Sequence, residues 1–157
     1  MVENVKNYLN KYGLKDRLIE LNEDTSTCIL AAKALGCTSD EIAKTMAFMV
    51  DNTPIVIVLA GDHKIDNHKY KDYFNCKATM VKKEQLPSVI GHSMGGVCPF
   101  CLKEKVKIYL DNSLKKYQYV YPAGGSSNSA VKLTIKELES IINNPVWIDV
   151  VKYEEEN

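Results

Sequence analysis

The sequence has no long apolar run, and its first residues carry charge. The longest apolar segment, residues 55–60, is much shorter than the roughly 20 residues that a transmembrane helix needs. Residues 1–6 lack the apolar centre of a secretory signal peptide. The sequence therefore predicts a cytoplasmic protein without a membrane partner.

Arginine is almost absent, with Arg17 as the single example, and this argues against an arginine-rich nucleic-acid reader. Lysine is not scarce. The chain has 20 basic and 20 acidic residues, and residues 61–116 hold 11 lysines against six acidic residues. Any contact with a polyanion is therefore expected from lysines of this middle segment and from backbone amides.

Motifs of several enzyme classes are also missing. There is neither a P-loop nor a Rossmann fingerprint, so nucleotide-dependent phosphoryl transfer and NAD chemistry lack support. There is no Gly-x-Ser-x-Gly elbow, which argues against a serine hydrolase. His63, His68 and His92 are too scattered for a triad or a ligand cluster, and the first two are expected at the surface. We expect neither a cofactor nor a metal.

The five cysteines, an odd number, do not form a disulfide framework and are expected to be reduced. Cys98 and Cys101 form a Cys-x-x-Cys motif, which in thioredoxin-like proteins follows the first strand and opens a long helix. Here the motif comes late in the chain, after a glycine-rich loop, and no second pair completes a zinc site. A thiol oxidoreductase is therefore the least favoured alternative.

The length of 157 residues and the hydrophobic content of 45% fit one domain over residues 1–157. Local patterns predict helices over 2–12, 28–35, 38–45, 67–74, 82–90 and 135–142. They predict strands over 17–21, 46–50, 54–60, 76–80, 106–110, 117–121 and 130–133. Hairpins combined with separated helices predict an α/β fold with a mixed sheet.

Two glycine-rich loops, residues 91–100 and 123–129, are the most informative local feature. Their Gly-Gly pairs permit positive φ angles and a close approach of backbone amides to a ligand. Such amides can bind a phosphate or stabilise an oxyanion. The alternative, which the spacing alone favours, is that both loops are ordinary tight turns.

Lys44 has no distinctive local signal. A capping box at Thr38 and Glu41 predicts the helix over 38–45, in which Ile42 and Ala43 mark the apolar side and Lys44 falls away from it. This pattern predicts a solvated surface lysine.

Three ordered segments nevertheless resemble the YbaK/EbsC family, an editing-domain superfamily that also includes the insertion domain of bacterial prolyl-tRNA synthetases. The first segment is residues 25–36 followed by Glu41-Ile42-Ala43-Lys44-Thr45. The second is Gly91-x-x-x-Gly95-Gly96-Val97-x-Pro99-Phe100, and the third is Asp111 followed by Ala123-Gly124-Gly125. Each motif is weak alone, but their order and spacing agree over most of the chain.

The resemblance implies a single α/β domain with a central mixed, barrel-like β-sheet flanked by helices. It also implies a free-standing deacylase that hydrolyses the ester of mischarged tRNA, typically tRNA for proline carrying alanine or cysteine. The implied partner is the 3′ aminoacyl-adenosine end of that tRNA, with an aminoacyl-tRNA synthetase as an optional second partner. No cofactor is implied.

The same resemblance assigns catalytic roles to Lys44 and to the backbone of Gly96. Lys44 would fix the terminal adenosine or its phosphate, or would polarise the ester carbonyl, and the sequence leaves both roles open. An activated ester needs only a positioned water and a stabilised oxyanion. The implied substrate-binding residues are Thr25, Thr45, Gly95, Val97, Pro99, Gly124, Gly125 and Ser126.

The chain departs from the family after the second Gly-Gly pair. Relatives often carry a charged or imidazole side chain there, whereas this chain has Ser126-Ser127-Asn128-Ser129-Ala130. The edited amino acid is therefore open. The departure also keeps a second hypothesis, a non-catalytic module that binds tRNA or a synthetase through the same pocket.

Overall fold

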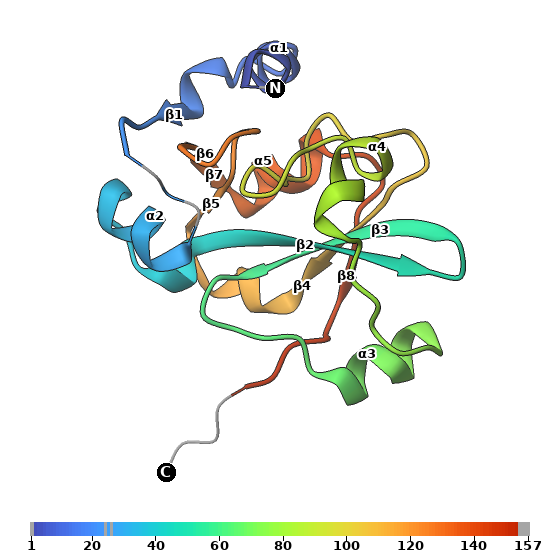
Figure 1. Ribbon diagram of the computed structural model, residues 1–157. Helices are drawn as coiled ribbons and strands as arrows, with labels where there is room; N and C mark the ends of the chain where they lie inside the picture. The colour runs from blue at the N-terminus through green and yellow to red at the C-terminus, as the bar shows by residue number, and fades with distance from the viewer. Residues whose placement is uncertain (1, 24, 26, 154–157) are drawn as a thin grey trace.

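The computed structural model describes residues 2–23, 25 and 27–153 (Figure 1). Its helices are α1 (Val2–Asn10), α2 (Cys28–Leu35), α3 (Asn67–Phe74), α4 (Leu86–Val89) and α5 (Ile135–Ile141). Its strands are β1 (Leu18–Glu20), β2 (Ile42–Val50), β3 (Thr53–Ala60), β4 (Lys107–Asp111), β5 (Tyr119–Pro122), β6 (Ser129–Val131), β7 (Leu133–Thr134) and β8 (Val146–Ile148). Short 3₁₀ turns include η2 (Ser39–Glu41) and η4 (Asn112–Lys116).

A six-stranded sheet in the order β7-β5-β2-β3-β4-β8 forms the centre of the fold. β2 and β3 are an antiparallel hairpin, and the φ angles of 50° at Asp51 and 59° at Asn52 suit its tight turn. The neighbouring β4 and β5 run parallel to β3 and β2, and β1 pairs separately with β6. The predicted α/β fold, with a central mixed sheet that curls into a half-barrel and is flanked by helices, is confirmed.

Apolar side chains cover both faces of the central sheet. On β3, Val58 belongs to one core cluster together with Leu138 of α5, and Ile57 belongs to a second cluster together with Tyr70 of α3. Adjacent strand residues point to opposite faces, so a strand that is buried on both faces reads as a continuous apolar run. This explains the unbroken apolar segment at residues 55–60.

The prediction of a helix over residues 38–45 is wrong. The capping box does form, with the Glu41 carboxylate accepting the N–H of Thr38 at 2.9 Å, but the turn that it opens ends at Glu41. The chain continues as β2 because eight residue pairs join β2 to β3. Non-local pairing outweighs the local helix signal, and Lys44 therefore lies on a strand.

The prediction of a strand over residues 76–80 is also wrong. This segment contributes one isolated bridge, between Met80 and Phe48 of β2. β8 was not predicted, because its three residues give too short a pattern. The predicted helix over 82–90 is a 3₁₀ turn, Lys83–Gln85, followed by the four-residue α4. The other predicted helices and strands are confirmed with shifted ends, and the strand over 130–133 is divided into β6 and β7.

Candidate functional site

A pocket of about 250 Å³ opens at the edge of β2. On this side β5 covers β2 only at Ile42 and Ala43, and the segment 79–81 covers it only around Phe48. Between these contacts, residues 44–46 have no strand partner on that side in the part of the chain that the structure describes. The pocket lies at this gap, and residues of α2, α4 and the first glycine-rich loop complete its lining.

The pocket is mostly apolar. Its small aliphatic lining comes from Ala43, Ala47, Val81, Leu86, Val97 and Ala123. Met80 and Met94 also line it, and their exposed fractions of 57% and 65% place them at the mouth. The few polar side chains are Thr25, Thr27, Cys28, Lys44 and Thr45. A concave apolar chamber with a small number of polar groups is the usual form of a small-ligand site.

Lys44 and Thr45 reach the pocket from opposite faces of β2, because successive side chains of a strand alternate. Ala43 and Ala47 belong to the core cluster that contains Leu86 of α4, and Thr45 shares their face. Met46, on the face of Lys44, packs against the cluster around α3. The Lys44 ammonium forms no ion pair with any described residue.

Lys44 acts electrostatically on one neighbour. Burial raises the pKa of the Cys28 thiol, and the positive charge of Lys44 opposes that rise. The ammonium therefore lies near the start of α2. The carboxylates of Asp62 and Asp40 act on the same thiol in the opposite sense, but neither forms an ion pair with Lys44. An unpaired cation beside a pocket is available for an anionic or carbonyl oxygen of a ligand.

Thr45 offers three polar groups at the gap. Its Oγ1 is buried and has no hydrogen-bond partner among the described residues. The C=O of Ala47 and the N–H of Met49 bond to the segment 79–81, with N···O distances of 3.0 and 2.9 Å. Alternate residues of an antiparallel strand direct these groups to the same side, so the N–H and C=O of Thr45 face the gap.

The two glycine-rich loops pack backbone against backbone. A Cβ on Gly96 would lie 2.6 Å from the carbonyl oxygen of Gly125, and one on Gly95 would lie 3.1 Å from the Cβ of Ser127. Gly95 also has a φ of 89°, a conformation that favours glycine. Thr25 donates its N–H and its hydroxyl to the carbonyl of Ser127, at 2.7 and 2.6 Å. Together these contacts join the two loops to the segment before α2.

Half of the predicted site residues line the pocket, namely Thr25, Lys44, Thr45, Gly95 and Val97. The others, Gly96, Pro99, Gly124, Gly125 and Ser126, lie outside the lining. Gly96 donates its N–H to Ser93 at 3.0 Å, and the Ser126 hydroxyl bonds within its own loop. Gly96 and Gly125 form the contact between the two loops, and direct contact of any of the five residues with a ligand stays a prediction.

Several lining residues were missed by the sequence reasoning. Met80 and Val81 reach the pocket through the bridge between their segment and β2, and Leu86 reaches it from α4. No local pattern signals such a contact. The tight packing of the two loops was likewise visible in the sequence only as two glycine pairs.

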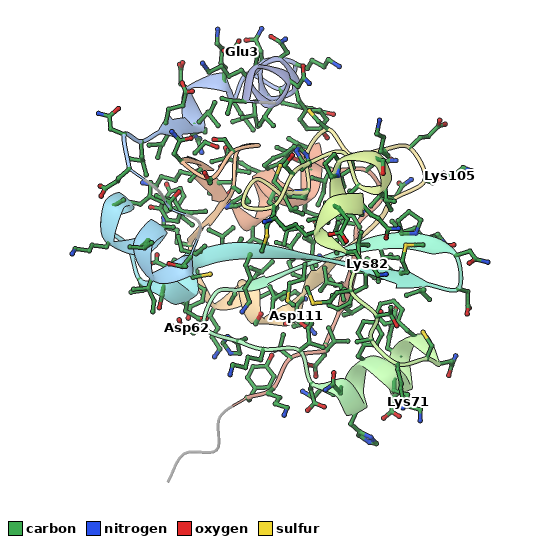
Figure 2. The ribbon with its side chains drawn as sticks, viewed as in Figure 1. Glu3, Asp62, Lys71, Lys82, Lys105 and Asp111 are labelled. Atoms are coloured by element: carbon green, nitrogen blue, oxygen red, sulfur yellow. The ribbon has the colours of Figure 1, made fainter. Side chains whose placement is uncertain are left out.

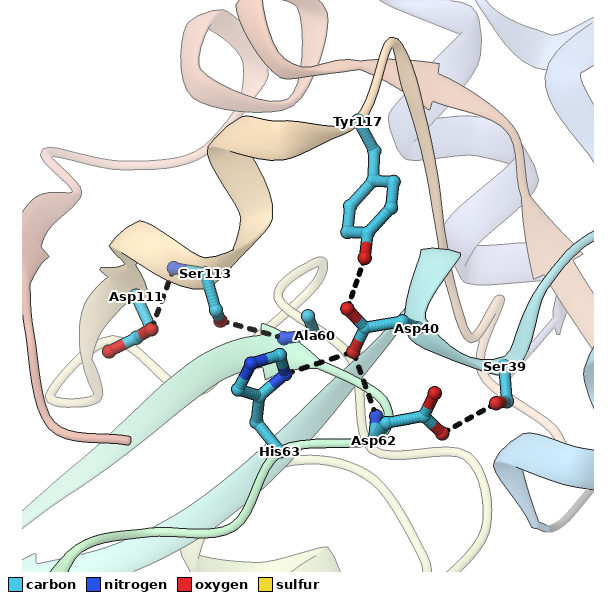
Figure 3. Close-up of polar contacts among 8 residues, drawn as sticks. All are labelled: Ser39, Asp40, Ala60, Asp62, His63, Asp111, Ser113 and Tyr117. Carbon is cyan, nitrogen blue, oxygen red and sulfur yellow. Dashed lines mark hydrogen bonds and ion pairs between the residues drawn. The ribbon is translucent and has the colours of Figure 1, made fainter. Parts of the chain in front are cut away.

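Asp40, which lies in η2 two residues before β2, is the centre of a polar network (Figure 3). One carboxylate oxygen accepts the N–H of Asp62 at 3.0 Å and contacts Nδ1 of His63 at 2.9 Å, and the other accepts the hydroxyl of Tyr117. Burial favours the neutral acid, but these hydrogen bonds outweigh it and hold the pKa of Asp40 below 3.8. The prediction of a surface position is wrong for His63, whose side chain is 13% exposed. It is confirmed for His68, at 85%.

Asp111 of the third motif is fully buried at the end of β4 and joins this strand to η4 and to the segment after β8. Its carboxylate accepts the N–H groups of Ser113 and Val150, both at 2.8 Å. The Ser113 hydroxyl in turn accepts the N–H of Ala60 at 3.1 Å (Figure 3). Asp111 therefore stabilises the fold beside the site and does not line the pocket.

The burial of the first cysteine of the Cys-x-x-Cys motif does not suit a redox-active thiol. Burial raises the pKa of Cys98 to about 12, whereas a reactive thiolate needs a lowered pKa. Its sulfur lies 3.4 Å from Nε2 of His92, which is also buried. Among residues 2–23, 25 and 27–153, no group of three metal-ligating side chains occurs, and no helix is long and apolar enough to cross a bilayer.

Comparison with known proteins gives consistent matches. A family profile described as the aminoacyl-tRNA editing domain matches residues 22–141. The uncharacterised protein YwhH of Bacillus subtilis is 39% identical over 152 residues, which span 96% of this chain and 97% of that protein. Proline–tRNA ligases of Staphylococcus aureus are 37% identical over 82 residues, which span 52% of this chain and 14% of the ligase.

Two solved structures share the fold over nearly the whole chain. One, proposed as a trans-editing enzyme for prolyl-tRNA synthetase, superposes with a TM-score of 0.87 at 24% identity and covers 97% of both chains. A second, a hypothetical protein, gives a TM-score of 0.85 at 25% identity and covers 95% of this chain and 99% of its own.

Proposed function

Because the chain belongs to the aminoacyl-tRNA editing domain family, we propose that it is a deacylase that removes a wrong amino acid from the 3′ end of tRNA. The observation that carries this proposal is the meeting of Lys44 and Gly95 around one apolar pocket at the open edge of β2. The structural neighbour proposed as a trans-editing enzyme supports action on tRNA that a synthetase has released.

The proposed reaction is ester hydrolysis. A water oxygen adds to the ester carbonyl, the bond from that carbon to the ribose oxygen breaks, and the ribose hydroxyl leaves with a proton. The products are the free amino acid and an intact tRNA. Such a site can accelerate hydrolysis by positioning the water and stabilising the oxyanion, without a nucleophilic side chain.

Two kinds of donor support the proposed chemistry. The Lys44 ammonium supplies positive charge, either to the terminal adenosine or its phosphate or to the developing oxyanion. The N–H of Thr45 faces the gap, and the N–H of Gly95 has no backbone acceptor among the described residues. A role of Lys44 in binding would appear mainly in KM, and a role at the oxyanion would appear in kcat.

The proposal also names the tRNA that is bound and the amino acids that are removed. The matches to proline–tRNA ligases support tRNA for proline as the acceptor. The family resemblance makes alanine and cysteine the first amino acids to test. The pocket volume of about 250 Å³ suits a small aminoacyl group.

The test is a panel of tRNAs for proline, each charged with a different amino acid and incubated with the purified protein. We expect at least one small aminoacyl ester to be hydrolysed much faster than it is in buffer. If every ester survives, the chain is not a deacylase for this panel. Binding of a non-hydrolysable aminoacyl-adenosine analogue without turnover would instead select the non-catalytic module.

A further inference from the structure

Among the threonine hydroxyls that line the pocket, only that of Thr45 has no hydrogen-bond partner among the described residues. Oγ1 is buried and finds neither donor nor acceptor among the described residues. The other threonine hydroxyls of the lining are used: Thr25 donates to the carbonyl of Ser127, and Thr27 accepts the N–H of Leu30 at the start of α2. A buried hydroxyl without a partner destabilises a protein, so a ligand group that pairs with it gains that free energy.

The surroundings of this hydroxyl are apolar. Thr45 lies between Ala43 and Ala47 on the face of β2 that turns toward Leu86, and Val81 and Val97 also line this part of the pocket. None of these side chains offers a hydrogen bond. On this face of β2, the Thr45 hydroxyl is therefore a polar group set among aliphatic side chains, beside the peptide groups of the open strand edge.

Lys44 reaches the same pocket from the other face of β2. If the ester and ribose of an aminoacyl ester lie on the side of Lys44, its amino-acid side chain crosses the strand edge to the side of Thr45. The peptide groups of Thr45 lie between the two sides. The strand edge thus separates the chemistry of the ester from the recognition of the side chain.

We propose that Thr45 is a specificity-determining residue that hydrogen-bonds a β-hydroxyl of the aminoacyl group, so that the pocket prefers seryl and threonyl esters to their apolar counterparts. This inference rests on the proposed deacylase function and names its substrate class. A site built to pair with a substrate hydroxyl discriminates against the analogue that lacks it, because its own polar group is then left buried and unpaired. A thiol is a weaker partner, so a cysteinyl ester ranks between seryl and alanyl.

The experiment compares kcat/KM for tRNA for proline charged with serine, alanine, threonine or valine, in the wild type and in two variants. Thr45→Val removes the hydroxyl and keeps the shape, and Thr45→Ser keeps the hydroxyl. We expect the wild type to prefer seryl to alanyl and threonyl to valyl by about 10–100-fold. Thr45→Val should reduce both preferences to near unity, mainly by slowing the hydroxylated substrates, and Thr45→Ser should retain them.

Equal rates for seryl and alanyl esters in the wild type, or an unchanged preference in Thr45→Val, would overturn the inference while leaving the deacylase intact. Binding of non-hydrolysable seryl- and alanyl-adenosine amides separates the two claims. Preferential binding of the seryl amide without hydrolysis of any ester would retain the role of Thr45 and reject the deacylase. The thermal midpoint of Thr45→Val should equal or exceed that of the wild type, because no hydrogen bond is lost.

Discussion

Two polar regions lie next to each other along the chain and differ in how their polar groups are satisfied. In the network around Asp40, both carboxylate oxygens have protein partners, which are Asp62, His63 and Tyr117. Only four residues later, Lys44 has no ion-pair partner and Oγ1 of Thr45 has no hydrogen-bond partner among the described residues.

The difference separates groups that hold the fold together from groups that are available to a ligand. Buried polar groups of folded proteins are nearly always paired, so an unpaired one calls for an explanation. Asp40 joins η2, the loop after β3 and the end of η4, and we expect its loss to change stability. The polar side-chain groups of Lys44 and Thr45 bond to no other described element, and we expect their loss to change function.

The largest effect is expected at Lys44. Lys44→Ala should lower kcat/KM for the preferred ester by about 10²–10³-fold, the range found when one donor to a developing oxyanion is removed. The thermal midpoint should stay close to that of the wild type, because Lys44 has no described ion pair to lose. The matched control is Lys33→Ala, which removes an exposed lysine of α2 outside the pocket and should leave both quantities unchanged. A fully active Lys44→Ala would contradict the assignment of the unpaired lysine to function.

Substitution of Asp40 should lower stability and change activity little, which is the reverse of the effect expected at Lys44. Asp40→Ala leaves the groups of Asp62, His63 and Tyr117 without their acceptor, and should lower the free energy of unfolding by about 2–3 kcal/mol. Chemical denaturation measures this loss, with Asp16→Ala as the control for removal of an exposed carboxylate. The activity per folded molecule should change little. A stable Asp40→Ala with no activity would reverse the assignment of the two regions.

Gly96 tests whether the pocket wall depends on backbone contact. An alanine Cβ would lie 2.6 Å from the Gly125 carbonyl, so Gly96→Ala should cost about 2 kcal/mol and loosen the contact between the loops. Gly36→Ala is the comparison, since Gly36 has a φ of 72° and open space around it. Backbone strain alone should cost about 1 kcal/mol there. Equal losses in the two variants would show that contact between the loops contributes nothing.

The dependence of the unfolding free energy on pH in acid tests the role of the Asp40 charge. Its pKa in the folded protein lies below the ordinary value of 3.8, so it stabilises the fold above that value and this contribution is lost as the pH falls through the folded-state pKa. The difference in unfolding free energy between the wild type and Asp40→Asn should therefore shrink as the pH is lowered from 6 to below about 3. A difference that is constant with pH would show that the charge of Asp40 has no role.

The smallest expected effect concerns the lysines beside the pocket mouth. Lys77, Lys82 and Lys83 are exposed, form no ion pair with described residues and flank Met80 and Val81 of the pocket lining in the sequence. Figure 2 labels Lys82. If they contact phosphates near the 3′ end, each substitution by alanine should reduce the slope of log(kcat/KM) against log[salt] by about 0.7. Slopes identical to the wild type in all three variants would place the tRNA elsewhere.

Much of the fold could be predicted from the sequence, because many signals are local. The helix over residues 28–35 has its N-cap at Thr27 and its left-handed end at Gly36, and the β2–β3 turn has Asp51 and Asn52. The helix over residues 38–45 failed because its capping box was real but short, and pairing with β3 decided what followed. β8 was missed because three residues give too short a pattern and because its pairing with β4 is non-local.

The site could be predicted only in part. The family resemblance directed attention to Lys44 and to the glycine-rich loops, whereas the helical pattern had placed Lys44 on the surface. Lys44 and Thr45 point to opposite faces because they are successive residues of a strand. The prediction of a helix over 38–45 therefore could not give this orientation. The contribution of Met80 and Val81 depends on one bridge to β2, which no sequence pattern announces.

The most direct test of the contrast between the two regions is an NMR titration of the protein with a non-hydrolysable seryl-adenosine amide. We predict that the largest shift changes occur at the amides of Lys44, Thr45 and Gly95, while the signals of Asp40 and Tyr117 stay in place. Shifts centred on Asp40 and Tyr117, with an unperturbed strand edge at Lys44 and Thr45, would contradict the account.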